Sequence, residues 1–305
     1  MIEAIFSVLP IYFFIFLGFI AKKRFTTQID EKTLVLLSLY FFQPILILWG
    51  LTKSPINYEF IMSPLFYIII VFTTLSFLIF FSKIIFNSRT DESIYLGTAL
   101  IGNTGNLGIP LGIALFGVES VPYTSIINIA NVFFMYTISV YFFAREQFSL
   151  KQAIISIFKI PAIWFALFAI FLNYYQVPIS EHITTALNMG AYTSLTIQLF
   201  IFGVYLYNVQ VKTIPWKLSL HISFAKHILL PVIGILVIVW FTDFNSFVAS
   251  ILIMELMMPL AVNNVNFAVL YNCKPFDVAA TILISSIIFV FLLYFYIEII
   301  NYFIK

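Results

Sequence analysis

The sequence predicts an all-α polytopic membrane protein with ten transmembrane helices, built as two inverted five-helix repeats with crossed, broken helices 4 and 9. Three observations predict this fold: an apolar composition, apolar runs long enough to cross a bilayer, and an odd number of runs in each half. Of the 305 residues, 62% are hydrophobic and 9% are charged, whereas about 25% of a typical soluble domain is charged. A soluble surface needs more charge than this, so the composition excludes a soluble enzyme, a nucleic-acid-binding protein and a disordered chain.

The apolar runs have the length of transmembrane helices, which need about 20 residues. A transmembrane β-barrel would instead show alternating stretches of about ten residues. The linkers leave no room for a soluble domain, and no small-residue cleavage site follows the first run, so we expect that run to remain as the first helix. The ten expected spans are residues 3–21, 33–51, 61–86, 93–117, 120–144, 153–174, 183–208, 218–241, 246–271 and 276–301.

The basic residues predict the orientation, because the cytoplasmic loops of membrane proteins are enriched in Lys and Arg. With the N-terminus outside, 13 of the 15 basic residues fall on the cytoplasmic side, and only Lys53 and Lys305 lie outside. We therefore expect a multi-pass protein of the cell (inner or cytoplasmic) membrane with both termini extracytoplasmic. The cytoplasmic basic residues are Lys22, Lys23, Arg24, Lys32, Lys83, Arg89, Arg145, Lys151, Lys159, Lys212, Lys217, Lys226 and Lys274.

The chain divides near residue 148 into two halves of five spans each, residues 1–148 and 149–305. Because five is an odd number, the second half enters the membrane from the opposite side, which is the plan of an inverted repeat. Three pairs of residues recur in the two halves with offsets of 149 to 151 residues, which supports the repeat. These pairs are Pro10 with Pro161, Glu31 with Glu181, and Pro110 with Pro259.

The fourth span of each half is expected to contain a broken helix. Residues 102–111 read GNTGNLGIPL, and residues 255–264 in the other half read ELMMPLAVNN. Proline removes a backbone donor and clashes with the preceding turn. Unpaired backbone groups are costly in lipid, so such a break belongs inside the protein or beside water. The residues expected to set the breaks are Gly105, Gly108, Pro110 and Pro259.

The breaks offer groups that bind ions. The N–H groups at helix N-termini suit a carboxylate, free carbonyl groups at broken helix ends suit a small cation, and Asn side chains both donate and accept hydrogen bonds. If the two breaks cross, several polar residues converge on a substrate there. The alternative is that Gly and Pro only permit close packing and kinks. The expected substrate-binding residues are Asn103, Thr104, Asn106, Asn263 and Asn264.

Glu255 is an acid placed well inside a span, where carboxylates are costly and mark functional sites. We expect it to bind a coupling ion, Na⁺ or H⁺, or to pair with Lys226 or His227 near the cytoplasmic end of the eighth span. The alternative is a protonated Glu bonded to a neighbouring helix. Gln43 and Pro44 predict a kink in the second span, with cavity lining as the alternative. No cofactor and no structural metal site is expected.

Two motifs resemble those of a known transporter family. Asn103 and Thr104, followed by GIPL at residues 108–111, are similar to the first crossover of the auxin efflux carrier family, which includes plant PIN-type carriers and bacterial permeases often assigned to malonate or malate. MPLAVN at residues 258–263, with Tyr271 closing the span, resembles the second crossover of that family. The bile acid:sodium symporters are more distantly similar.

The resemblance implies a scaffold domain, a transport domain that holds the crossed helices, an elevator-like movement and a homodimer. It implies that Asn103 and the region of Asn263 contact a substrate carboxylate, and that Pro110 and Pro259 set the breaks. The family often has Gln or another residue where this chain has Glu255. The bile acid:sodium symporters have a Glu near that place which binds sodium, and this favours cation coupling.

These features predict a secondary transporter, or permease, for a small organic anion such as a mono- or dicarboxylate, working by alternating access with Na⁺ or H⁺ as the candidate coupling ions. Its expected partners are the anion, the lipid bilayer and a second copy of the chain, and no nucleic acid. The alternatives are an uncoupled auxin-type efflux uniporter of aromatic or indole carboxylates, and an anion channel. An enzyme is disfavoured, because the sequence has no HExxH motif and no arrangement of catalytic Ser or Asp residues.

Overall fold

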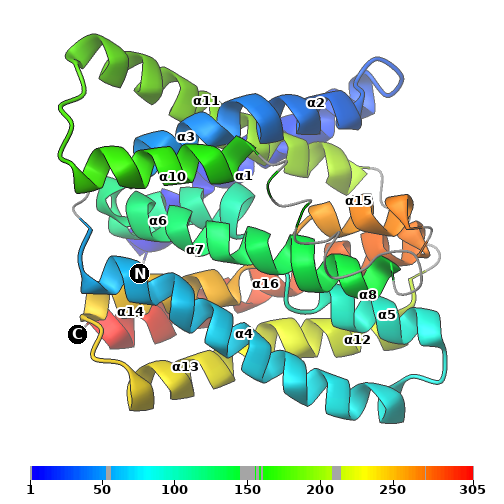
Figure 1. The fold of residues 1–305 in the computed structure, drawn as a ribbon. Coiled ribbons are helices and arrows are strands. Elements are labelled where there is room, and N and C mark those ends of the chain that lie inside the picture. The colour runs from blue at the N-terminus through cyan, green and yellow to red at the C-terminus, as the bar shows by residue number, and fades with distance from the viewer. Residues whose placement is uncertain are drawn as a thin grey trace. The chain divides into compact units, whose positions relative to one another are not determined.

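A computed structural model of the chain describes residues 2–52, 56–144, 155, 158, 161–207, 214–271 and 273–304. Within these ranges the regular elements are helices (Figure 1). They are α1 (Ile2–Arg24), α2 (Glu31–Leu37), α3 (Gln43–Leu51), α4 (Tyr58–Ile85), α5 (Arg89–Thr98), α6 (Ile109–Phe116), α7 (Val121–Phe134), α8 (Val140–Ala144), α10 (Pro161–Tyr174), α11 (Glu181–Tyr207), α12 (Trp216–Phe224), α13 (Leu230–Phe241), α14 (Ser246–Met257), α15 (Asn263–Leu270) and α16 (Pro275–Ile304).

Six helical stretches of the described chain are long and apolar enough to cross a bilayer. Three of them continue through a single π-type turn, which joins α2 to α3, α7 to α8, and α12 to α13. The chain is therefore an all-helical polytopic membrane protein, as its composition predicts. The six stretches are Glu31–Leu51, Tyr58–Ile85, Val118–Ala144, Glu181–Tyr207, Trp216–Phe241 and Pro275–Phe303.

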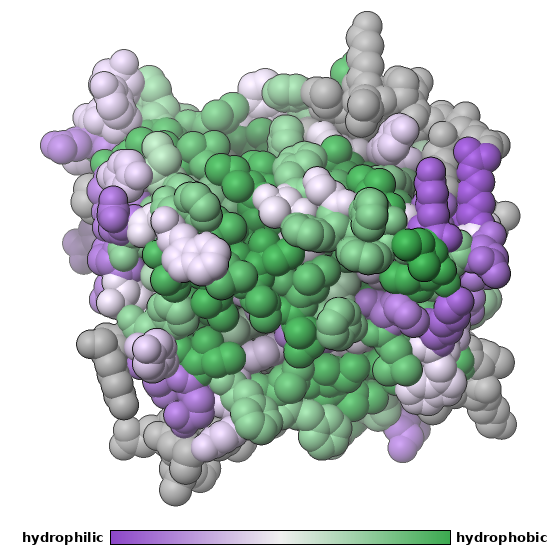
Figure 2. All heavy atoms as spheres, turned by 90° about the horizontal axis from the view of Figure 1, so that it is seen from below, coloured by the Kyte–Doolittle hydropathy of each residue, from purple (hydrophilic) through white to green (hydrophobic). Residues whose placement is uncertain are grey.

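Large apolar side chains are exposed along several of these helices, as expected of helices that contact lipid. Figure 2 shows apolar side chains in a broad band across the face that it draws, with polar side chains gathered at the two ends of the band. A soluble monomer rarely exposes a continuous apolar area of this kind. On α4, the exposed apolar side chains include Leu65, Ile69, Phe72, Phe77, Phe80 and Ile84.

The described chain forms two compact units, each assembled from separate segments. The first unit comprises Met1–Ile61, Gly105–Ile129 and Phe158–Asn208, and the second comprises Met62–Thr104, Ala130–Ile157 and Val209–Lys305. The predicted repeat boundary at residue 148 lies outside the described residues, so the division into two repeats stays a prediction. Some basic residues used for the predicted orientation also lie outside them, namely Lys53, Arg145, Lys151, Lys159, Lys212 and Lys305.

In the first unit, α1 and α11 cross with their backbones in contact. A Cβ atom added at Gly203 would lie 1.8 Å from the carbonyl oxygen of Ile15, and one added at Gly18 would lie 2.0 Å from that of Phe200. Only glycine permits this approach, which is how membrane helices commonly pack. The helix α3 packs against both α10 and α11 (Figure 1). The buried apolar cluster there contains Leu46, Trp49, Ile109, Val121, Ala191 and Leu195.

In the second unit, α16 packs against α12, α14 and α15, and α5 packs against α8 and α12. A salt bridge of 2.6 Å joins Lys274, which directly precedes α16, to Asp91 in the first turn of α5. This salt bridge joins the start of the first broken span, which begins with α5, to the segment that follows α15 of the second broken span. The second unit thus holds α5, α14 and α15, which flank the two breaks.

Candidate functional site

Both predicted helix breaks are present in the structure. In the first, α5 ends at Thr98, residues 101–103 are extended, and a π-type turn over Thr104–Gly108 leads into α6. In the second, the helix is interrupted between α14 and α15 at residues 258–262. Met258 has a ψ of 143°, because the following proline disfavours the helical region for the residue before it.

The two breaks meet as a short antiparallel pair of extended segments. The N–H of Asn103 donates to the carbonyl oxygen of Pro259 at 2.7 Å, and the N–H of Ala261 donates to that of Ile101 at 2.9 Å. Gly102 and Leu260 form the bridge between these bonds. The pairing satisfies backbone groups that neither a helix nor lipid satisfies at this point. This helix crossing is the candidate site.

Asn131 holds the first extended segment in place. Its side-chain Nδ2 donates to the carbonyl oxygen of Gly102 and to the hydroxyl of Thr104, both at 2.9 Å, and its Oδ1 accepts a hydrogen bond of 2.9 Å from the hydroxyl of Tyr67. All these side chains are buried. Sequence reasoning missed both Asn131 and Tyr67, although an Asn in the middle of an apolar span was a signal for a buried polar contact.

Ser285 holds the second extended segment. Its Oγ accepts a hydrogen bond of 3.2 Å from the N–H of Leu260 and lies 2.9 Å from Nε2 of His227. The other ring nitrogen of His227 lies 3.0 Å from the hydroxyl of Tyr296. His227 therefore supports the crossing through Ser285, and its contacts are with α16 residues rather than with Glu255. Ser285 and Tyr296 were not among the predicted residues.

The predicted binding residues differ in their surroundings. Asn103 is 3% exposed, Thr104 and Asn264 are fully buried, and Asn263 and Asn106 are half-buried. Nδ2 of Asn103 and Oδ1 of Asn264 are buried and have no hydrogen-bond partner among the described residues. Such groups are costly unless something pairs with them. They are therefore the donor and acceptor at the crossing that suit a polar ligand.

Five further predicted residues belong to the first unit, as Asn106 does, whereas Glu255 belongs to the second. Pro110 lies in the first turn of α6, after the π-type turn rather than within the extended segment. Gly105 lies beside Asn128, because an added Cβ atom would be 2.9 Å from its Oδ1. Gln43 and Pro44 are buried in the first turn of α3, directly after the π-type turn Ser38–Phe42. Gly108 closes the π-type turn of the first break.

Lys226, which the sequence offered as a partner of Glu255, lies in the π-type turn between α12 and α13 and is fully buried. Its Nζ donates to the carbonyl oxygen of Leu256 at 3.2 Å. A lysine inside a span either extends to the membrane boundary or turns inward to a polar partner, and only the packing of other helices decides between these.

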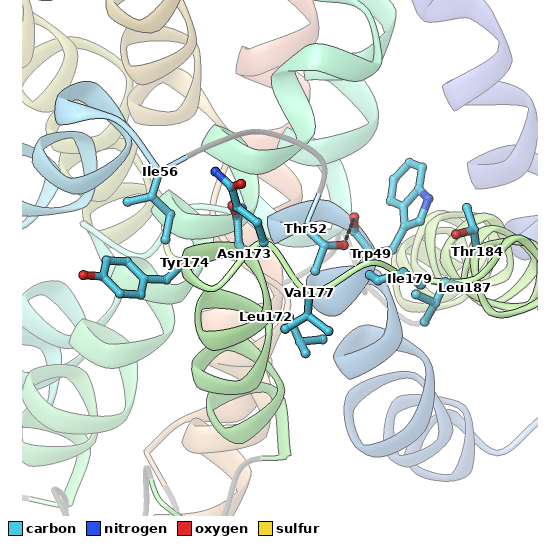
Figure 3. A pocket seen from close by; sticks show the side chains of 11 residues that line it. Trp49, Thr52, Ile56, Leu172, Asn173, Tyr174, Val177, Ile179, Thr184 and Leu187 are labelled. Atoms are coloured by element: carbon cyan, nitrogen blue, oxygen red, sulfur yellow. Dashed lines mark hydrogen bonds between the residues drawn. The ribbon is translucent and has the colours of Figure 1, made fainter.

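A cavity of about 660 Å³ in the first unit is a separate feature, located where α3 and α10 end and α11 begins (Figure 3). Trp49, Thr52, Asn173 and Leu187 are among its lining residues, none of which is charged in the described part of the chain. The side-chain donors of Trp49, Thr52 and Asn173 are already bonded within the protein. The cavity therefore offers less to a carboxylate than the helix crossing does.

Membrane-spanning helices with two interruptions that pair with each other are typical of membrane transport proteins. The chain matches the family described as "Membrane transport protein" over residues 3–297. It belongs to this family, which is the auxin efflux carrier family that its two motifs resemble. No curated protein matches the chain by sequence.

Proposed function

We propose that this membrane transport protein carries a small organic anion, such as a mono- or dicarboxylate, and binds it at the helix crossing. The observation that carries the proposal is the buried, unpartnered Nδ2 donor of Asn103 beside the paired breaks. A carboxylate oxygen is the acceptor that such a donor suits. The α15 helix begins at Asn263, and the positive end of its dipole adds to the attraction for an anion.

The proposed mechanism is alternating access by an elevator-like movement. Its architecture is ten spans in two inverted repeats, residues 1–148 and 149–305, with helices 4 and 9 crossed and the protein assembled as a homodimer in the cell membrane. Both termini are extracytoplasmic in this proposal. Two findings support it. The chain forms two compact units, and the unpartnered atoms Nδ2 of Asn103 and Oδ1 of Asn264 lie at the two helix breaks, where transporters with broken helices bind their substrates.

Glu255 is the proposed coupling group. Its side chain is fully buried, and neither carboxylate oxygen accepts a hydrogen bond from the described residues. A buried carboxylate at membrane depth is costly, and in transporters it marks an ion or proton site. We propose that Glu255 binds and releases the coupling ion, Na⁺ or H⁺, as the substrate site opens alternately to the two sides of the membrane.

The test is a thermal-shift screen of the purified protein against malonate, malate, benzoate and indole-3-acetate, followed by uptake into proteoliposomes of any acid that stabilises it. An acid at 100 times its Kd stabilises the bound state by about 2.7 kcal/mol. We expect one acid to raise the Tm of the wild type and of Asn87→Ala, whose residue is exposed in a loop, but not that of Asn103→Ala. Uptake should saturate with concentration.

Two outcomes would contradict the proposal. If Asn103→Ala responded to the acid as strongly as the wild type, the crossing would not be the binding site. If uptake rose linearly with concentration at high turnover, the protein would be a channel. Stabilisation by indole-3-acetate alone, independent of Na⁺ and pH, would instead support an uncoupled efflux carrier of aromatic acids.

A further inference from the structure

The ammonium group of Lys226 lies against the helix crossing within the second unit. Lys226 is fully buried, and its Nζ donates to the carbonyl oxygen of Leu256 at 3.2 Å. Gly102, at the centre of the crossing, leaves room for it, since a Cβ atom added there would lie 2.8 Å from the same nitrogen. A buried lysine therefore contacts both of the broken spans.

The carbonyl group of Leu256 is free to accept this bond because the helix breaks. In an uninterrupted helix it would accept from the N–H of residue 260, but that N–H donates to the hydroxyl of Ser285 instead. Leu256 thus lies in the last turn of α14, where unpaired carbonyl groups form the negative end of the helix dipole. In transporters with broken helices, such a helix end is the place where a metal cation binds.

Glu255 adds a negative charge at the same helix end. It directly precedes Leu256, its side chain is buried, and it interacts electrostatically with Lys226. The two side chains together carry no net charge when both are ionised. A sodium ion added beside them would leave a net buried positive charge, which is costly in an environment of low polarity.

We infer that Lys226 is a built-in cation that occupies the place of a coupling metal ion at the crossing, so that substrate binding and transport by this protein are independent of Na⁺. The inference rests on the proposed function. It excludes Na⁺ as the coupling ion at Glu255 and leaves H⁺. Lys226 acts here as a positioning residue. It neutralises the end of α14 and fixes the crossing without contacting the substrate.

The test uses the Tm of the purified protein in NaCl and in N-methyl-D-glucamine chloride at equal ionic strength. The wild type should have the same Tm in both salts. Lys226→Ala removes the ammonium and leaves space beside the carbonyl of Leu256, so Na⁺ or methylammonium should raise its Tm by about 2 °C or more. Lys226→Met is the matched control, because it removes the charge but fills the space, and its Tm should respond to neither ion.

The inference is overturned if Na⁺ raises the Tm of the wild type, a measurement that needs no variant. It is also overturned if neither Na⁺ nor methylammonium stabilises Lys226→Ala. Should Lys226→Ala not fold, the double variant Lys226→Met, Glu255→Gln removes both charges together and should have a higher Tm than either single variant. An equal or lower Tm would then overturn the inference.

These readouts need no transported acid, so they separate the two proposals. If no carboxylate stabilised the wild type but Na⁺ stabilised Lys226→Ala, the inference about Lys226 would stand and the proposed substrate would be wrong. If an acid is transported, its uptake by the wild type should be unchanged when external Na⁺ is replaced by N-methyl-D-glucamine. Uptake that fell at least tenfold on this replacement would contradict the inference.

Discussion

The main-chain N–H of Asn103 donates a hydrogen bond of 2.7 Å to the carbonyl oxygen of Pro259. The backbone of a predicted substrate-binding residue in one half of the chain is therefore fixed by the predicted break residue of the other half. Any shift of the second broken span moves the amide side chain of Asn103 as well. The crossing is for this reason a single structural element, although its two parts are far apart in the sequence.

Asn131→Leu should destabilise the protein. The substitution leaves the carbonyl of Gly102 and the hydroxyl of Tyr67 without the partner that they now have, and each buried unsatisfied group costs about 1–3 kcal/mol. The measurement is the Tm of Asn131→Leu, Tyr67→Phe and the double variant. If the effects of the two single substitutions simply added, the two residues would not be coupled through this bond.

Gly203→Ala should destabilise the first unit. The added methyl group would lie 1.8 Å from the carbonyl oxygen of Ile15, so α1 and α11 must separate, and overpacking of this kind typically costs about 1–3 kcal/mol. Gly190→Ala on the same helix is the comparison, because the atoms nearest to its methyl group would be side-chain atoms of Ile45 rather than backbone atoms of another helix, so the loss of Tm should be smaller. Equal losses of Tm in the two variants would argue against a backbone contact at Gly203.

Glu255→Gln should remove the dependence of transport on the coupling-ion gradient. Gln has the same shape but cannot carry the ionic charge of the buried carboxylate. The measurement is uptake of the transported acid into proteoliposomes, with and without an imposed pH gradient. Wild-type uptake should respond to the gradient, and that of the variant should not. An undiminished response in Glu255→Gln would assign the coupling to another residue.

Lys274→Met should destabilise the protein slightly, in a manner that depends on pH. The hydrogen bond from Lys274 to Asp91 raises the pKa of the lysine above its usual value. Its stabilising effect is thus fully present below the unfolded-state pKa of about 10.4 and is lost as the pH rises through the higher folded-state pKa.

Because the Lys274–Asp91 pair is partly exposed, its contribution should be at most about 1 kcal/mol and should decrease with added salt. The measurement is the difference in Tm between the wild type and Lys274→Met as a function of pH and of salt. A difference that stayed constant at high salt would mean that Lys274 stabilises through packing rather than through charge.

The family, the all-helical membrane fold and the positions of the two breaks were predictable from the sequence, because each depends on local chemistry. A bilayer sets the length of the apolar runs. Proline at position 259 disrupts a helix whatever surrounds it, and the interruption at residues 258–262 lies around it. The first interruption lies several residues before Pro110, since a proline fits readily in the first turn of a new helix.

Only the tertiary structure decided which groups meet at the crossing. The sequence placed Asn131, Ser285 and Lys226 inside apolar spans, but the direction in which each side chain points depends on the helices that pack around it. The structure turns all three toward the paired breaks. The physical reason is that backbone groups freed by a broken helix must find partners where no water is available, and those partners come from other spans that only folding brings near.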